Sequence, residues 1–114
     1  MREERGTVSG ELVVYEEYTL WGTAAGTVRV IDGGRFYLRG AVFGDIVVEA
    51  GGRMHIFGRV SGNVTIGRGT KVIHGGVIGG NLINEGGRLF LEPTAKVNGK
   101  TKTMAGETKP TELP

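Results

Sequence analysis

The chain has 114 residues, of which 22 are glycine, three are proline and none is cysteine. This length fits one small domain, and the lack of cysteine excludes disulfides and thiolate metal sites. Fourteen basic and twelve acidic residues leave a formal charge of +2, which is too balanced to indicate a nucleic-acid-binding protein. No apolar run reaches the roughly 18 residues that cross a bilayer, and the reducing cytoplasm is the expected compartment.

Residues 1–5 form a short charged lead-in, and a repeat begins directly after them. The frame Gly-x-x-x-Gly recurs at spacings of 16, 18, 18 and 18 residues. Its copies are Gly6/Gly10, Gly22/Gly26, Gly40/Gly44, Gly58/Gly62 and Gly76/Gly80. A weaker sixth copy ends at Gly99, so the predicted repeat domain covers residues 6–99.

Apolar residues in each copy lie two apart, which is the period of a β-strand and not of a helix. The aligned copies give five columns that we expect to point inward: Val8, Ala24, Val42, Val60 and Ile78; Leu12, Val28, Ile46, Val64 and Leu82; Val14, Val30, Val48 and Ile66; Tyr18, Phe36, Met54, Val72 and Leu89; and Leu20, Leu38, Ile56 and Leu91. Asn84 and His74 interrupt these columns late in the chain. For His74 the alternative is a local bulge that turns Ile73 inward.

Three short strands per repeat, joined by corners where glycine supplies a positive φ, describe a triangular coil. One coil cannot bury its own inner face, so successive coils must stack as parallel strands about 4.8 Å apart. We therefore predict an all-β fold, a triangular β-solenoid of five to six coils and about 25 Å in length. Residues 100–114 are polar, contain two prolines and lack the repeat, and we interpret them as a disordered tail.

Two copies carry the succession Gly-x-Val-x-Gly-[Asp/Asn]-[Ile/Val], at Gly40 to Ile46 and at Gly58 to Val64. Together with a following Gly-Gly-Arg, this pattern resembles the bactofilins, a family of polymer-forming bacterial cytoskeletal proteins. The resemblance implies a right-handed β-helix with disordered tails that assembles end to end without nucleotide. Many bactofilins have a longer core, and some carry an apolar N-terminal segment for membrane attachment that Met1 to Arg5 does not match. The inner face of the membrane is an alternative location, because some members of that family attach there.

The first and last rungs of a solenoid leave backbone groups unpaired, as any edge strand does. We expect these rungs to mediate self-association into a homo-oligomer or filament, through the end-coil residues Leu12, Val14, Leu89, Leu91 and Val97. Acidic residues near the first coil and basic residues after the last favour head-to-tail contact. The alternative is that the tail folds across one end and prevents assembly.

Two outer surfaces are candidate binding sites. Aromatic residues expected to point outward form a partner face for another protein, for instance in a small regulatory or toxin-neutralising complex: Trp21, Tyr37, Phe57 and Phe90. Basic residues at one corner form a column that would attract phosphate, phospholipid or glycan, and with it a membrane surface: Arg35, Arg53, Lys71 and Arg88. The alternative for this column is neutralisation by Asp32, Glu49 and Glu85.

The position after the second glycine of the frame is polar in most copies: Glu11, Asp45, Asn63 and Asn81. We interpret these residues as a ladder that hydrogen-bonds the corners, because one side chain per coil does not supply the six or more oxygens that calcium requires. His55 and His74 lack the further ligands of a zinc site.

We expect no enzymatic activity and no cofactor. The 18-residue coil is similar to that of hexapeptide-repeat acyltransferases, but the two-glycine corners break their six-residue register. The sequence contains no nucleophile elbow, phosphate loop or metal motif.

Overall fold

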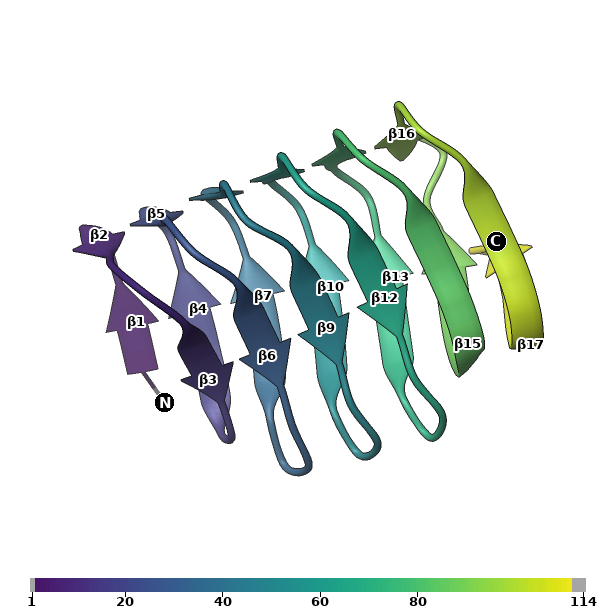
Figure 1. Ribbon diagram of the computed structural model, residues 1–114, viewed down its shortest axis with the longest axis horizontal. Coiled ribbons are helices and arrows are strands. Elements are labelled where there is room, and N and C mark those ends of the chain that lie inside the picture. Colours follow the sequence, from purple (N-terminus) through teal and green to yellow (C-terminus); the bar gives the residue numbers. More distant parts are fainter. Residues whose placement is uncertain (1, 112–114) are drawn as a thin grey trace.

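The computed structural model describes residues 2–111 of the chain. They form a parallel β-solenoid of about six turns with about 18 residues per turn, a short prism with extents of 32 × 27 × 26 Å (Figure 1). The all-β solenoid predicted from the repeat is therefore confirmed. No helix among the described residues is long and apolar enough to cross a membrane.

The strands of successive turns stack into three faces of the prism. Face A contains the four-residue strands and consists of β1 (Arg2–Glu4), β4 (Glu17–Leu20), β7 (Arg35–Leu38), β10 (Arg53–Ile56), β13 (Lys71–His74) and the second parts of β15 (Leu82–Leu91) and β17 (Thr101–Pro110). Face B has two-residue strands: β2 (Thr7–Val8), β5 (Thr23–Ala24), β8 (Ala41–Val42), β11 (Arg59–Val60), β14 (Val77–Ile78) and β16 (Lys96–Val97). Face C consists of β3 (Leu12–Val14), β6 (Val28–Val30), β9 (Ile46–Val48), β12 (Val64–Ile66) and the first parts of β15 and β17.

The five predicted columns form the core of the prism. Each rung pairs in parallel with the next at matching positions, so that Phe36 lies between Tyr18 and Met54, and Val48 between Val30 and Ile66. Most members of the columns are fully buried, and the partly buried ones, such as Val8 and Leu12, lie near the ends. Burial of these aliphatic side chains is the main favourable contribution to folding.

Most glycines of the repeated frame serve a different purpose from the predicted one. A Cβ built on Gly40 would overlap the carbonyl oxygen of Gly22 one rung earlier, and a Cβ on Gly58 would overlap that of Gly40. These glycines are therefore required because neighbouring backbones approach closely at that corner. Positive φ occurs at one glycine of the frame, Gly10 in the first turn with φ of 74°, and otherwise at the corner between faces C and A, for example at Gly51 with φ of 84°.

The prediction of a disordered tail is wrong for residues 101–110, which form β17 and pair in parallel with β15 along both of its parts. The charged lead-in is likewise part of the solenoid, because Arg2–Glu4 pair with Tyr18–Leu20 as β1. An unpaired rung offers backbone donors and acceptors to any segment of matching length, which a composition-based reading of the tail neglects. Met1 and residues 112–114, the remainder of the predicted lead-in and tail, lie outside the described residues.

The two polar interruptions of the columns both point inward. His74 is fully buried between Ile56 and Leu91, so the alternative bulge that would turn Ile73 inward is wrong. Asn84 is also fully buried and has all its polar atoms engaged. Its amide nitrogen donates to the carbonyl oxygens of Gly87 and Glu107, and its oxygen accepts from the Gly86 and Gly87 N–H groups.

Candidate functional site: the ends of the solenoid and the outside of face A

Charged residues occupy inward positions at the N-terminal end of the prism. Arg2 pairs with Tyr18, and Glu4 with Leu20, so both continue columns that are apolar in the following turns. The Arg2 guanidinium lies 5.6 Å from the centre of the Tyr18 ring, and Glu4 Oε2 accepts a hydrogen bond from the Gly6 N–H at 3.0 Å. Burial, with the nearby Glu4 carboxylate, raises the pKa of Tyr18, and Arg2 opposes that shift. This end thus presents charge around the half-buried Val8 and Leu12.

Threonines and a proline occupy the inward positions at the C-terminal end. They continue the columns on faces C and A: Thr101, Thr103, Thr108 and Pro110. The hydroxyls of Thr103 and Thr108 lie 2.7 Å apart, and the Asn84 amide donates to the Thr108 hydroxyl at 3.1 Å. The last rung therefore closes the core with hydroxyl groups that water can also satisfy.

The outermost rungs contain only some of the residues predicted for end contact. Leu12 and Val97 lie in the first and last rungs of their faces and are half-buried. Val14 belongs to the first rung of face C but is only 1% exposed. Leu89 and Leu91 lie beneath β17, and Leu89 is fully buried, so neither belongs to the outermost rung.

The backbone edges at the two ends have one partner strand each. Among residues 2–111, β1, β2 and β3 pair only with β4, β5 and β6, while β16 and β17 pair only with β14 and β15. Both ends therefore retain a row of N–H and C=O groups directed along the axis, as edge strands do.

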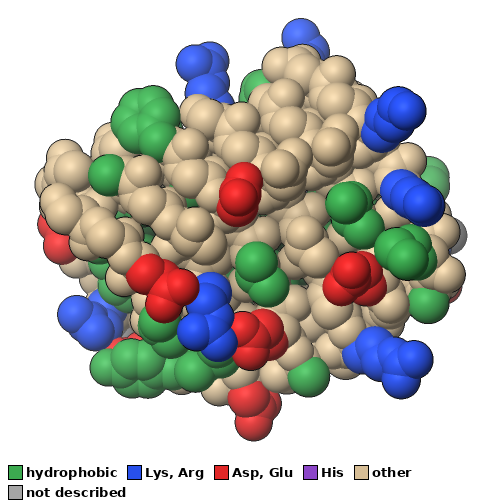
Figure 2. All heavy atoms as spheres, in the orientation of Figure 1, with side chains coloured by type: hydrophobic (Ala, Val, Ile, Leu, Met, Phe, Trp, Pro, Cys, Tyr) green, Lys and Arg blue, Asp and Glu red, His purple; other side chains and the backbone are tan. Residues whose placement is uncertain are grey.

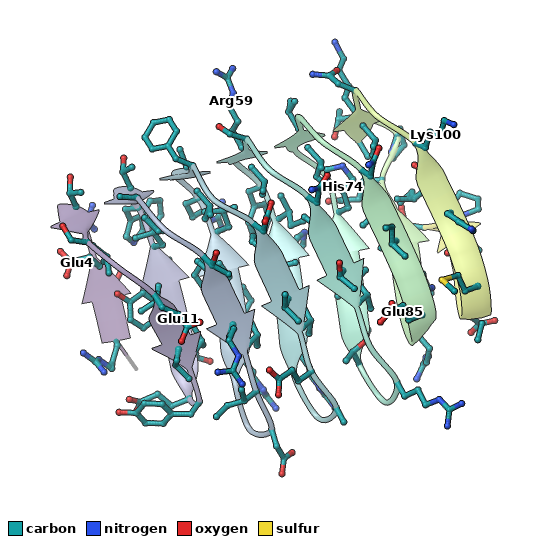
Figure 3. The ribbon with its side chains drawn as sticks, in the orientation of Figure 1. Glu4, Glu11, Arg59, His74, Glu85 and Lys100 are labelled. Atoms are coloured by element: carbon teal, nitrogen blue, oxygen red, sulfur yellow. The ribbon has the colours of Figure 1, made fainter. Side chains whose placement is uncertain are left out.

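The two ends also differ in charge. Residues 2–17 contain five glutamates and two arginines, a formal charge of −3, whereas residues 95–111 contain four lysines and one glutamate, a formal charge of +3. Lys and Arg side chains gather at the C-terminal edge of the prism in Figure 2. Figure 3 shows Glu4 and Glu11 at one end and Lys100 at the other.

Arginine and lysine side chains lie against three of the four aromatics of the predicted partner face. At the corner that follows face A, Trp21 lies between Arg5 and Arg39, at 5.1 and 5.4 Å from ring centre to guanidinium carbon. Arg39 also stacks over Phe57 at 3.8 Å. Tyr37 and Phe90 lie in the neighbouring outward column of face A, where Phe90 is within 6 Å of Lys71, Arg88 and Lys109. Trp21, Phe57 and Phe90 thus form cation–π contacts.

The predicted cation column lies in register along face A. Arg35, Arg53, Lys71 and Arg88 pair successively through β7, β10, β13 and β15. Glu49, predicted as a counter-charge, instead pairs with Arg29 at 2.7 Å. Arg88 lies 3.9 Å from Glu107, while Asp32 and Glu85 form no ion pair within the described residues.

The predicted polar ladder is confirmed for three of its four residues, Asp45, Asn63 and Asn81. Oδ1 of Asp45 accepts from the Asn63 N–H, Oδ1 of Asn63 from the Asn81 N–H, and Oδ1 of Asn81 from the Lys100 N–H, each at 2.8 Å. Each side chain thereby satisfies a backbone donor of the next rung.

The two histidines have separate environments. Nε2 of His55 lies 3.1 Å from Glu92 Oε1, and its ring stacks on Phe57. His74 donates from Nε2 to the Lys96 carbonyl oxygen at 2.9 Å, and burial lowers its pKa. No group of three or more potential metal ligands of the His, Asp and Glu types comes together in residues 2–111.

Comparison of the chain with models of known protein families, with curated protein sequences and with solved structures found no match.

Proposed function

We propose that this chain is a structural protein, a bactofilin-like scaffold with a right-handed coil, which polymerises by stacking the end of one copy on the opposite end of the next. The proposal rests on the two end rungs: each has an unpaired backbone edge on its outer side, and the two ends carry opposite formal charges. Edge strands pair readily with another chain, and contact between two different surfaces gives an open polymer when the rotation does not close. The sequence resemblance to bactofilins supports the same assembly.

The number of rungs on each face constrains this contact. Face A has seven rungs and faces B and C have six each, so the coil ends on the face where it begins. If a second copy stacked face A on face A, faces B and C would each lack one rung at the junction. Continuous strand pairing at a spacing of about 4.8 Å requires the second copy to be rotated about the solenoid axis by one third of a full turn. Its β1 then stacks on β16 of the first copy.

The charges at the ends distinguish the turned contact from the unturned one. Glu3 points outward on β1, Lys96 outward on β16 and Lys109 outward on β17. In the turned contact Glu3 of one copy lies over Lys96 of the next. In the unturned contact it lies over Lys109.

Sedimentation velocity over a range of concentrations and salt tests the proposal. We expect species that grow with concentration and that weaken as salt screens the end charges. Lys96→Glu weakens association by about tenfold, equivalent to about 1.4 kcal/mol, and Glu3→Lys in the same chain restores it. Arg59→Glu is the matched control, because Arg59 carries the same charge on face B in a central turn and points away from both ends (Figure 3).

Two outcomes would change this interpretation. Restoration by Glu3→Lys of a Lys109→Glu variant, and not of Lys96→Glu, would select the unturned contact. A chain that stays monomeric at its highest soluble concentration in low salt would contradict polymerisation and favour the alternative, a small protein-binding module.

A further inference from the structure

The first three members of the cation column on face A form no ion pair within the described residues. Successive members stand about 4.8 Å apart, a spacing at which like charges repel unless they are neutralised. Within residues 2–111, no carboxylate oxygen lies within 4.0 Å of a charged nitrogen of Arg35, Arg53 or Lys71. Three consecutive cations are therefore available to an external anion.

A groove runs beside these three cations on the outside of the prism. It has a volume of about 190 Å³, with Arg35, Arg53 and Lys71 on one side and Tyr37, His55 and Ile73 on the other. The two rows are the first and third positions of β7, β10 and β13, so both point outward from the same face. The groove thus combines a row of positive charge with a wall of aromatic, imidazole and aliphatic groups.

Carboxylates close the column at both ends. Glu17 pairs in register with Arg35 on the N-terminal side, and Glu107 pairs with Arg88 on the C-terminal side. Along the axis, this outward column of face A therefore consists of one glutamate, four cations and a second glutamate. A long polyanion lying along this line would meet a repelling charge at each end, whereas a short one would not.

We infer that this groove is a binding site for a short linear oligophosphate chain, two or three phosphates long, held by Arg35, Arg53 and Lys71. Arginine suits this role because its guanidinium contacts phosphate oxygens in pairs. A single phosphate reaches fewer of the three cations than a chain that extends along the rungs. Tyr37 contributes a hydroxyl donor and a ring face to whatever group the phosphates carry. The inference does not depend on polymerisation.

Calorimetric titration of the purified chain with inorganic tripolyphosphate at low ionic strength tests the site. We expect binding of one tripolyphosphate per chain, at least tenfold tighter than orthophosphate. Arg53→Gln should weaken it at least tenfold. Arg59→Gln is the matched control: both arginines are exposed and begin their strands, but Arg59 lies on face B. Both variants should retain the circular dichroism of the parent, because neither side chain belongs to the core.

The bracketing glutamates give a second, independent readout. A polyphosphate of many units should bind no more tightly per chain than tripolyphosphate, and the double variant Glu17→Gln/Glu107→Gln should bind the long polymer more tightly. Equal weakening by Arg53→Gln and Arg59→Gln would overturn the site, since it would reflect diffuse charge. Unweakened binding in Arg53→Gln, or orthophosphate that binds as tightly as tripolyphosphate, would overturn it too.

Discussion

The central turns and the last turn of the solenoid are held together by different forces. From β7 to β12 every inward side chain is apolar and almost wholly buried, as Phe36, Ile46 and Val64 illustrate. In the last turns His74, Asn84 and the β17 threonines take the corresponding positions. A central rung is covered on both sides, so apolar burial is complete, whereas the β17 threonines face water and can hydrogen-bond to it. His74 and Asn84 are fully buried and instead donate hydrogen bonds to the carbonyl oxygens of Lys96 and Glu107 in the last strands. The comparison indicates that the chain changes its chemistry where stacking ends.

Removal of a central side chain should have the largest effect. Phe36 is fully buried between Tyr18 and Met54, and Phe36→Ala is expected to lower the free energy of unfolding by about 3–5 kcal/mol. Urea denaturation measures this loss. Tyr37→Ala, one residue along and pointing outward, is the control and should cost less than about 1 kcal/mol. Equal losses in the two variants would contradict the assigned alternation.

Removal of the Asn84 amide should detach the last rung selectively. Asn84→Ala leaves the N–H groups of Gly86 and Gly87 and the Glu107 carbonyl without their partner, at an expected cost of about 2–3 kcal/mol. Hydrogen exchange should then speed up in residues 101–110 while β7 to β12 stay protected. Asn63→Ala removes only one hydrogen bond at an exposed corner, and β17 should remain protected in it. Uniform loss of protection in Asn84→Ala would show that β17 is not a separate unit.

The smallest effect concerns acid sensitivity at His74. Because burial lowers its pKa in the folded chain, His74 contributes stability that is complete above the unfolded value of about 6.5 and is lost as pH falls towards the folded value. The nearby Glu92 carboxylate and the Lys96 carbonyl favour the protonated form and limit the shift. His74→Leu should therefore reduce the fall in unfolding free energy between pH 7.5 and 5.5, by at most about 1.4 kcal/mol per pH unit. Urea denaturation at both pH values measures it, and identical falls in the two proteins would contradict the assignment.

The sequence predicted the core well because the alternation of apolar residues survives in every central repeat. Val42, Ile46 and Val48 occupy their expected columns, and Asp45 and Asn63 form the expected ladder. Both features depend on residue type and spacing alone. They can be predicted without knowledge of the rest of the molecule.

The sequence did not predict the last strand, β17, because its inward positions hold threonine, which does not continue the apolar pattern. Thr101, Lys102 and Thr103 alternate inward and outward with the same period of two as Leu82, Ile83 and Asn84. That alternation was the available signal. Arg2 and Glu4 were missed for the same reason, since a charged residue was not expected at an inward position.

Ion pairs were the least predictable feature of the candidate sites. Glu49 lies four residues before Arg53 in the sequence, but its partner is Arg29, which belongs to the preceding rung and lies 20 residues away. In a solenoid the nearest charges are those one turn away, and rotamers decide which of them meet. Spacing along the chain therefore identified the cation column but not its counter-charges.

Paired strands in the central turns are offset by 18 residues, so a turn of this length can be added there without a change at either end. Each central rung pairs its backbone only with its two neighbours, so Gly40 to Phe57 is one complete turn of the backbone ladder. The His55–Glu92 contact is a side-chain contact that reaches two rungs along the axis. Duplicating this segment would lengthen the rod by about 4.8 Å and leave both tips chemically unchanged. Duplication of the coding segment for one central turn would therefore change the length of the solenoid in fixed steps.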